Sequence, residues 1–333
     1  MNNRLKCALI GCGTVSANHF YALDKLKEKV EVVALCDLSE EKCNDANRKY
    51  GFGARVYTDY LKMYDECKLD AVHIATPHYL HAPMTIEALK RGIYVFSEKP
   101  MCINEEQMEE MLKAERESTA SAAVCFQNRF CPAILKAKEI VKEDGGAVTG
   151  YGALFWERDE KYYTESGWRG RYETEGGGVM INQAIHTLDL LCEFLGKPVT
   201  VRATTNNRHL AGIIEVEDTC EGIIGFDSGK RANFYATTSF IGAASTTLFI
   251  VTKNHTVEMR GYDLFVDGEY VNTDDHKNFV GKACYGNGHL PLIERFYDAI
   301  LTGNEMPVTL ESAKHAVKLL LAAYKSNDET VNV

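Results

Sequence analysis

The feature that most constrains this chain is the alternation of strand-like and helix-like segments over residues 1–125. Short apolar runs typical of buried strands occur at residues 5–10, 31–36, 71–75, 94–97 and 121–125. Segments with helical patterns lie between them, at residues 15–27, 40–49, 84–91 and 105–117. Strands that alternate with helices predict parallel βαβ units, so we expect an α/β fold with a doubly wound parallel sheet of the Rossmann type.

The pattern changes in the second part of the chain. A helix is expected at residues 179–195, and strands follow it at residues 199–206, 218–226, 231–238, 246–252 and 256–259. Several of these strands alternate apolar and polar residues, which indicates a sheet with one covered face. Two closing helices are expected, at residues 290–301 and 311–325. We therefore expect an α+β domain with a large, open, mostly antiparallel sheet.

The length of the chain also favours two domains. It has 333 residues, and natural domains cluster around ~100–150 residues. We place the boundary where the pattern changes, giving one domain at residues 1–125 and a second at residues 126–333. The C-terminal helices of the second domain could pack back on the first.

The charge of the chain argues against two classes of partner. The formal net charge is −10, and the sequence contains no run rich in Lys and Arg. Nucleic acid and anionic membrane surfaces are therefore not expected as partners. The apolar run nearest the start covers only residues 7–10, whereas a membrane span needs ~20 apolar residues. We expect neither a signal peptide nor a membrane span.

The eleven cysteines indicate a reducing compartment. None of them forms a C-x-x-C pair, and several, such as Cys36 and Cys125, lie inside apolar runs. Free cysteine buries readily as a small hydrophobic residue, so we expect buried thiols in a cytoplasmic protein. The absence of metal-ligand spacing predicts no metal site.

A glycine-rich turn points to a dinucleotide cofactor. Gly11-Cys12-Gly13 follows the first predicted strand, and Thr14 and Val15 open the helix after it. Glycine lets the backbone approach a pyrophosphate, and the helix N-terminus donates N–H groups to it. A tight structural turn is the alternative interpretation of this short motif.

An acidic residue after the second strand refines the choice of cofactor. Asp37 lies 24 residues after Gly13, near the spacing at which a carboxylate accepts the ribose hydroxyls. The same carboxylate would repel a 2′-phosphate, and no arginine stands in the residues that follow, so NAD is favoured over NADP. Alternatively, Asp37 is only a turn or N-cap residue for the next helix.

Further motifs together identify a family. Residues 75–78 read Ala-Thr-Pro-His, residues 97–100 read Ser-Glu-Lys-Pro, residues 167–170 read Gly-Trp-Arg-Gly, and residues 176–189 read Gly-Gly-Gly-Val-Met-Ile-Asn-Gln-Ala-Ile-His-Thr-Leu-Asp. In this order they resemble the Gfo/Idh/MocA family, named after glucose–fructose oxidoreductase and inositol dehydrogenase. The resemblance covers essentially the whole chain. It implies NAD(P)-linked oxidation or reduction at a carbinol carbon, and a second domain that binds substrate and whose open sheet often forms an oligomer interface.

The resemblance also implies which residues are catalytic. Lys99 and His186 take the family's active-site positions, whereas Asn182 stands where many members have Asp. His186 follows Asn182 by four residues, so both are expected on one helix face. Histidine suits general acid/base work near neutral pH. The Lys99 ammonium suits a developing alkoxide, or a proton relay if its pKa is lowered, and the sequence leaves open which group transfers the proton.

The remaining site residues are assigned by the same motifs and by their places near predicted strand ends. The residues expected to contact the cofactor are Gly11, Gly13, Thr14, Val15, Asp37, Thr76, Pro77, His78, His81, Glu98, Lys99, Gln127, Trp168 and Arg169. The residues expected at the substrate are Lys99, Trp168, Arg169, Asn182, His186 and Tyr285. For an isolated histidine or lysine the structural interpretation is the ordinary one, and the family motif is what favours a functional role.

These observations favour an NAD-dependent oxidoreductase that moves a hydride to or from a secondary alcohol carbon of a sugar, cyclitol or glycoside. The alternative is a redox-neutral enzyme that oxidises a sugar transiently, so that a glycosidic or anhydro bond is cleaved or rearranged while NAD is recycled. A non-catalytic NAD-binding regulator is a third interpretation, disfavoured by the retained Lys99 and His186. The strand-rich second domain predicts a homodimer or homotetramer.

Overall fold

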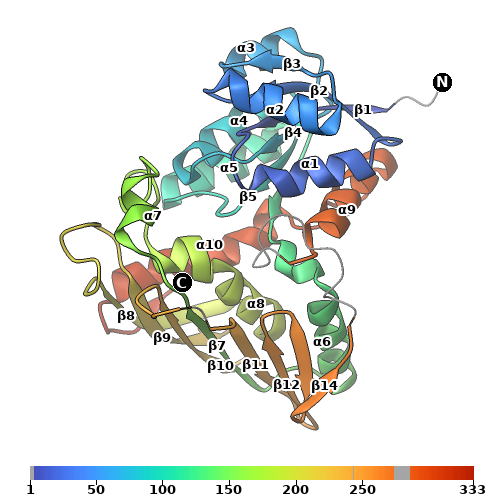
Figure 1. The fold of residues 1–333 in the computed structure, drawn as a ribbon. Helices are drawn as coiled ribbons and strands as arrows, with labels where there is room; N and C mark the ends of the chain where they lie inside the picture. The colour runs from blue at the N-terminus through green and yellow to red at the C-terminus, as the bar shows by residue number, and fades with distance from the viewer. Residues whose placement is uncertain (1–3, 243, 274–285) are drawn as a thin grey trace. The chain divides into compact units, whose positions relative to one another are not determined.

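The computed structural model describes residues 4–242, 244–273 and 286–333 (Figure 1). The chain divides into two compact units, each of which gathers segments distant in sequence. The first unit comprises Met1–Cys102, Glu106–Phe130 and Asn278–Ala313. The second unit comprises Ile103–Glu105, Cys131–Lys277 and Lys314–Val333.

The first unit is built on a six-stranded parallel sheet with strand order β3-β2-β1-β4-β5-β6. The strands are β1 (Leu5–Ile10), β2 (Val30–Cys36), β3 (Arg55–Tyr57), β4 (Ala71–Ile74), β5 (Tyr94–Glu98) and β6 (Ala122–Cys125). The helices are α1 (Ser16–Lys25), α2 (Glu40–Tyr50), α3 (Tyr60–Glu66), α4 (His81–Lys90), α5 (Glu105–Glu117) and α9 (His289–Thr302). All residues of β4 and β6 are buried, as expected for strands covered by helices on both faces.

The second unit is built on a nine-stranded sheet with strand order β14-β13-β12-β11-β7-β10-β9-β8-β15. Its strands are β7 (Thr149–Phe155), β8 (Pro198–Asn206), β9 (Thr219–Phe226), β10 (Arg231–Thr237), β11 (Thr247–Val251), β12 (Thr256–Arg260), β13 (Asp263–Val266), β14 (Glu269–Val271) and β15 (Val331–Asn332). Among the described strands of this second sheet, only the β7–β10 pair is parallel. The sheet is therefore mostly antiparallel, and the predicted fold class is confirmed for both units.

Helices pack against this second sheet. α8 (Ile185–Leu195) packs on β7, β10 and β11, and α6 (Pro132–Glu143) packs on β12 and β13. A short helix, α7 (Glu160–Thr164), lies in the connection after β7. The last helix, α10 (Leu310–Ser326), begins in the first unit and continues in the second from Lys314.

The predicted helix at residues 179–195 is helical throughout and contains a π-helical segment. Met180–Ala184 form a π-helical turn, and α8 begins only at Ile185. A π-turn pairs residues five apart instead of four, and such turns occur frequently at functional sites. Apolar spacing alone does not separate this geometry from an α-helix, so the sequence predicted the helix but not its π-helical segment.

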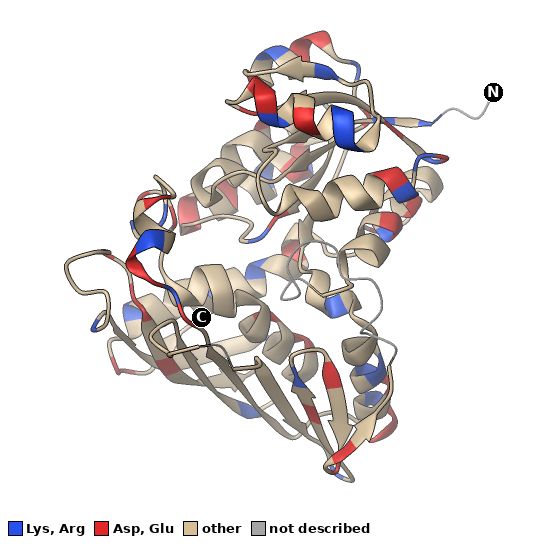
Figure 2. Cartoon of the chain, viewed as in Figure 1, with Lys and Arg blue, Asp and Glu red and all other residues tan. Residues whose placement is uncertain are grey.

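Most of the described cysteines are buried, as the sequence predicted. Figure 2 shows acidic and basic residues interspersed on both units. The ten described cysteines are all free thiols, and all except Cys12 and Cys67 are buried. Cys284 lies outside the described residues. Within the described parts of the chain, no helix is both long and apolar enough to cross a membrane.

Candidate functional site

The glycine-rich turn follows β1 and reaches the end of β4. Gly11 has φ +92°, and its N–H donates to Cys36 O at 2.8 Å. A Cβ at Gly11 would overlap the Ala75 carbonyl group, whereas a Cβ at Gly13 would meet nothing within 4 Å. Gly11 is thus required by close backbone packing, and Gly13 faces open space, where a cofactor pyrophosphate could approach the backbone.

The helix after this turn has an N-terminus suited to an anion. α1 has no side-chain cap at Val15 and no acidic residue in its first turn. Gly13 and Thr14 are exposed, and Ser16 Oγ donates to Gly13 O at 2.6 Å. Helix N-terminal N–H groups bind phosphate, so this turn has the donors and the space that a dinucleotide pyrophosphate requires.

Asp37 lies directly after β2 and is bound to the turn. Its Oδ2 accepts from Cys12 N at 2.8 Å, and its Oδ1 accepts from Ser39 N at 2.9 Å. Lys42 Nζ lies 3.9 Å away. A carboxylate has about four acceptor sites, so Asp37 orders the turn and retains capacity for the ribose hydroxyls. The two interpretations of Asp37, turn residue and ribose acceptor, are therefore compatible.

The ends of β4 and β5 carry the next group of predicted cofactor residues. Thr76 and Pro77 follow β4, and His78 begins a 3-10 turn. Glu98 is the last residue of β5, and Lys99 follows it. His81 connects the two strand ends, since its Nδ1 lies 2.7 Å from Pro100 O and its Nε2 lies 2.9 Å from Thr76 O.

His81 itself is better explained as a structural residue. It is buried, its burial lowers its pKa, and backbone carbonyls already engage both ring nitrogens. His78, also buried, lies with its ring centroid 5.9 Å from that of His81. His81 thus holds Thr76 beside the Lys99–Pro100 segment.

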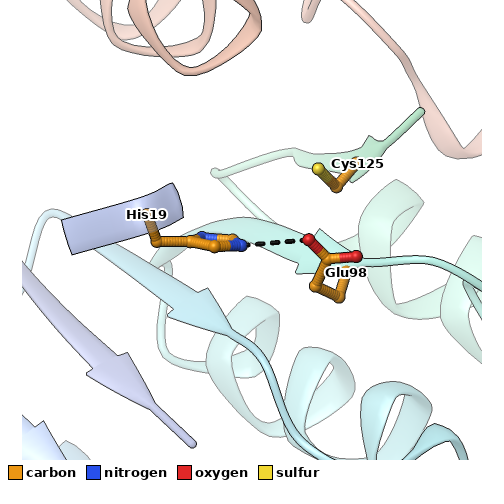
Figure 3. A group of neighbouring side chains, drawn as sticks. All are labelled: His19, Glu98 and Cys125. Carbon is orange, nitrogen blue, oxygen red and sulfur yellow. Dashed lines mark hydrogen bonds and ion pairs between the residues drawn. The ribbon is translucent and has the colours of Figure 1, made fainter. Parts of the chain in front are cut away.

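Glu98 anchors a buried polar network behind Lys99. Figure 3 shows His19 of α1 pointing at Glu98 of β5, and their Nε2 and Oε1 atoms lie 3.1 Å apart. His289 Nε2 lies 3.6 Å from the same oxygen. Burial opposes ionisation of Glu98, but the hydrogen bonds from His19 and His289 outweigh it and hold the pKa of Glu98 well below its ordinary value. Glu98 is therefore an ionised structural anchor as well as a predicted cofactor residue.

The same network extends across the sheet. His19 Nδ1 lies 2.9 Å from His73 Nδ1, and His73 Nε2 lies 2.7 Å from Tyr297 Oη on α9. Burial lowers the pKa of His73 well below its ordinary value. Internal polar groups are retained where they are hydrogen-bonded, so this chain of side chains fastens α1, β4, β5 and α9 together inside the first unit.

A metal-ligand arrangement also appears in this region. His19, Glu98 and Cys125 could offer three ligand atoms within 4.8 Å of one another. Figure 3 shows Cys125 on the neighbouring strand β6. Both ring nitrogens of His19 are already engaged by protein groups, and burial raises the pKa of the Cys125 thiol. Internal hydrogen bonding therefore explains why these three side chains lie together. Gln127 is buried directly after β6, and its Oε1 lies 3.9 Å from Cys125 Sγ.

The Gly-Gly-Gly segment of the second unit is held by a residue that the sequence did not indicate. Glu217 is 2% exposed, and its carboxyl oxygens accept from Gly178 N at 2.9 Å and Met180 N at 3.0 Å. Tyr324 Oη donates to the same carboxyl at 2.9 Å. A Cβ at Gly178 would overlap the Glu217 carbonyl oxygen. The close contact between the two backbone segments at this point therefore requires glycine at residue 178. Glu217 thereby caps the π-helical turn that carries Asn182.

Asn182 lies against a second buried carboxyl. Its Nδ2 lies 2.5 Å from Glu175 Oε1 and 3.3 Å from Tyr162 Oη. Glu175 is 1% exposed, and its Oε2 accepts from Gly170 N at 2.5 Å. Burial raises the pKa of Glu175 to about 7, against the hydrogen bonds from Gly170 and Asn182 and the charge of Arg169. Only its position directly before the Gly-Gly-Gly segment could have drawn attention to Glu175.

Two arginines gather on Tyr162 beside this pair. The guanidinium carbons of Arg169 and Arg158 lie 4.4 Å and 4.8 Å from the Tyr162 ring centroid. Arg169 also stacks on Trp168 at 4.7 Å. Cation–π contacts of this kind fix the planes of the guanidinium groups. The second unit therefore brings Trp168, Arg169 and Asn182 into one cluster with Tyr162.

His186 lies in the first turn of α8, four residues after Asn182, and is partly exposed. Tyr285 lies outside the described residues, so its predicted role is untested. Lys99 and the glycine-rich turn belong to the first unit, and Trp168, Arg169, Asn182 and His186 belong to the second. The predicted cofactor residues therefore lie in both units, since Trp168 and Arg169 belong to the second, and the predicted substrate residue Lys99 lies in the first.

Comparison with known proteins identifies the family. Residues 5–126 match the oxidoreductase family with an NAD-binding Rossmann fold, and residues 134–258 match the GFO/IDH/MocA C-terminal domain. The chain belongs to the Gfo/Idh/MocA oxidoreductase family, as its motifs predicted, and NAD is the cofactor of its Rossmann domain.

Individual relatives are distant. Oxidoreductase P35 of Formosa agariphila is 28% identical over 210 residues, which cover 61% of this chain and 64% of that protein, so the match spans less than two thirds of that relative. D-glucoside 3-dehydrogenase of Escherichia coli is 27% identical over 68% of each chain. The crystal structure of WlbA dehydrogenase from Chromobacterium violaceum, in complex with NADH and UDP-GlcNAcA, has a TM-score of 0.87 and 27% identity, covering 100% of this chain and 97% of that one.

Proposed function

We propose that this chain catalyses NAD-linked hydride transfer at a secondary alcohol carbon of a sugar, cyclitol or glycoside. The observation that carries the proposal is the pairing of Asn182, four residues before His186, with the buried carboxyl of Glu175, in a chain that keeps Lys99 directly after β5. Similarity to D-glucoside 3-dehydrogenase and to WlbA dehydrogenase supports a carbohydrate as the substrate.

The cofactor residues bind NAD and orient it. The turn at Gly11 and Gly13 and the N-terminus of α1 would hold the pyrophosphate, and Asp37 would accept the ribose hydroxyls. We also assign to the cofactor the other predicted residues of this unit: Thr76, Pro77, His78, Glu98 and Gln127. When bound, the nicotinamide ring supplies the hydride chemistry.

The chain's own residues manage the proton of the reacting hydroxyl. Oxidation requires a base within hydrogen-bond reach of that oxygen, and we assign this role to His186 or Lys99. The Lys99 ammonium stabilises negative charge on the oxygen as it develops. Asn182 orients the imidazole or the substrate, and Trp168, Arg169 and Tyr285 are assigned to substrate contacts.

Assembly and location belong to the same proposal. Tyr151 and Ile223 project from β7 and β9 and are 38% and 45% exposed. The strand pairing aligns Phe249, Tyr151, Asn233 and Ile223 in one row across four strands. An exposed row in which three of the four residues are large and apolar is typical of a protein interface, so we assign a homodimer or homotetramer. The buried free thiols support a cytoplasmic location.

A substrate screen tests the proposed activity. Sugars, cyclitols, uronates and glycosides are each incubated with the protein and with NAD or NADP, while nicotinamide absorbance is followed. Net reduction of NAD with at least one class, and none with the Lys99→Ala variant, is expected. Bond cleavage without accumulation of reduced NAD would instead indicate the redox-neutral recycling enzyme. No reaction in any arm, by a folded protein that binds NAD, would contradict both.

A further inference from the structure

The site has an amide where the family resemblance leads one to expect a carboxylate. Asn182 carries no charge, so it cannot by itself stabilise a protonated histidine as Asp would. Glu175, seven residues earlier in the chain, is almost fully buried and lies in hydrogen-bond contact with Asn182 Nδ2. A buried carboxyl is costly unless it is well bonded, and this one is bonded to Gly170 N and to Asn182.

We propose that Glu175 is the positioning carboxylate of this site, which fixes the Asn182 amide and supplies the negative charge that residue 182 lacks. The proposal deepens the function given above and rests on it, taking His186, of the two candidates His186 and Lys99, as the proton-handling group. Glu175 acts through Asn182 and is therefore a positioning residue.

The orientation of the Asn182 amide follows from the chemistry of its partner. An ionised carboxylate can only accept hydrogen bonds, so the NH2 group of Asn182 must face Glu175. The amide oxygen then points away from Glu175 and remains an acceptor. Asn182 thus presents to its surroundings the same kind of atom that an aspartate would present, with the charge placed one group further back.

Charged and titratable groups from several elements face Glu175. Arg169 favours its ionised form, Glu217 disfavours it, and Tyr163 of α7 also interacts with it electrostatically. Tyr162 Oη lies 3.3 Å from Asn182 Nδ2, on the amide that contacts Glu175. Because burial raises the pKa of Glu175 to about 7, the carboxyl changes its protonation state near neutral pH. When protonated it can donate to the amide oxygen and no longer dictates which way Asn182 faces.

A purely structural role is the competing explanation, since Glu175 also binds Gly170 N. The two explanations differ in what they predict for His186. A structural role predicts loss of folding stability alone. The positioning role predicts that the pKa of His186 follows the charge at residues 175 and 182.

The test measures the pKa of His186 directly, without substrate or cofactor. Protein labelled with 13C-histidine is titrated by NMR, and the His186 resonance is assigned from the His186→Gln variant among the ten histidines. Four variants are compared with the wild type: Glu175→Gln, Asn182→Asp, the double variant that exchanges carboxyl and amide, and Asp218→Asn. Asp218 is a fully buried carboxyl of the same unit that binds the N–H groups of Arg208, His209 and Leu210 instead of Asn182.

The expected results have opposite signs. Glu175→Gln lowers the His186 pKa by up to about 1, which is less than the ~1–3 of a carboxylate in direct contact. Asn182→Asp raises it, because two coupled carboxyls keep one charge close to His186. The exchange variant restores the wild-type value or exceeds it, and Asp218→Asn leaves it unchanged despite lost stability.

Unchanged His186 titration in both Glu175→Gln and Asn182→Asp would overturn the proposal. If Glu175→Gln does not fold, a lowered His186 pKa in the exchange variant would overturn it equally. Once a substrate is known, the acidic limb of the kcat profile should move to lower pH in Glu175→Gln, with KM less affected. A pKa response without any NAD reduction would refute the proposed function alone, and NAD reduction without a pKa response would refute this inference alone.

Discussion

Replacing Glu217 by Gln should make the stability of the second unit less dependent on pH. The carboxyl group of Glu217 is buried and accepts from Gly178 N, Met180 N and the Tyr324 hydroxyl. Burial raises its pKa from 4.5 to about 7, although these hydrogen bonds favour ionisation. Folding therefore takes up a proton between these two pH values.

The sign and size follow from linkage. Because the folded pKa lies above the unfolded one, the contribution of Glu217 to stability is fully present below pH 4.5 and is lost as pH rises through about 7. Each pKa unit corresponds to about 1.4 kcal/mol, so the wild type should lose about 3 kcal/mol across this range through Glu217. Glutamine does not titrate, and its NH2 group meets a backbone N–H, which costs about 1–3 kcal/mol.

The assay compares the two proteins at the same pH, so that other titrating groups cancel. Denaturant unfolding is followed by tryptophan fluorescence, and both tryptophans, Trp156 and Trp168, lie in the second unit. Glu217→Gln should be less stable than wild type near pH ~5 and comparable to it near pH ~8.

The matched variant Tyr324→Phe keeps the Glu217 carboxyl and removes one hydrogen-bond donor to it. Because that hydrogen bond lowers the pKa of Glu217, the variant should continue to lose stability up to a higher pH than the wild type does. A stability difference between Glu217→Gln and wild type that is the same at both pH values would refute the reasoning.

The remaining predictions concern cofactor, catalysis and assembly. Asp37→Ala should narrow the preference for NAD over NADP, since it removes the carboxylate that would repel a 2′-phosphate; equal or tighter NADP binding by the wild type would refute this. Lys99→Ala and His186→Ala should each lower turnover by ~10²–10⁴-fold with little change in NAD affinity measured by calorimetry, and full activity in either would remove that residue from the mechanism. Light scattering should find a dimer or tetramer that Tyr151→Lys weakens, whereas a wild-type monomer at micromolar concentration would contradict the assembly.

Local patterns predicted most of the first unit because its strands and turns are defined by neighbours in sequence. Apolar runs marked β1, β2, β4, β5 and β6, and the glycine-rich turn marked the start of α1. The short elements β3 and α3 were missed, since three and seven residues carry too little periodicity. In the second unit α6, β7 and β13–β15 were also not predicted.

The site was predictable only as far as its motifs extend. Lys99, Asn182 and His186 stand in contiguous motifs, so the sequence could single them out. Glu217 could not be found in this way, because it lies 37 and 39 residues from the backbone N–H groups that it binds. Glu175 lies close in sequence to Asn182, but its contact depends on a turn closed by Gly170 and on the π-helical geometry of Met180–Ala184.

Direct observation of hydride transfer tests the central claim best. The best substrate from the screen is prepared with deuterium on its carbinol carbon and mixed with the protein and a stoichiometric amount of NAD. Mass spectrometry should find reduced nicotinamide that is one mass unit heavier than ordinary NADH, in amounts that match the oxidised sugar. Reduced nicotinamide without the label, or oxidised sugar without reduced nicotinamide, would contradict NAD-linked hydride transfer from the carbinol carbon.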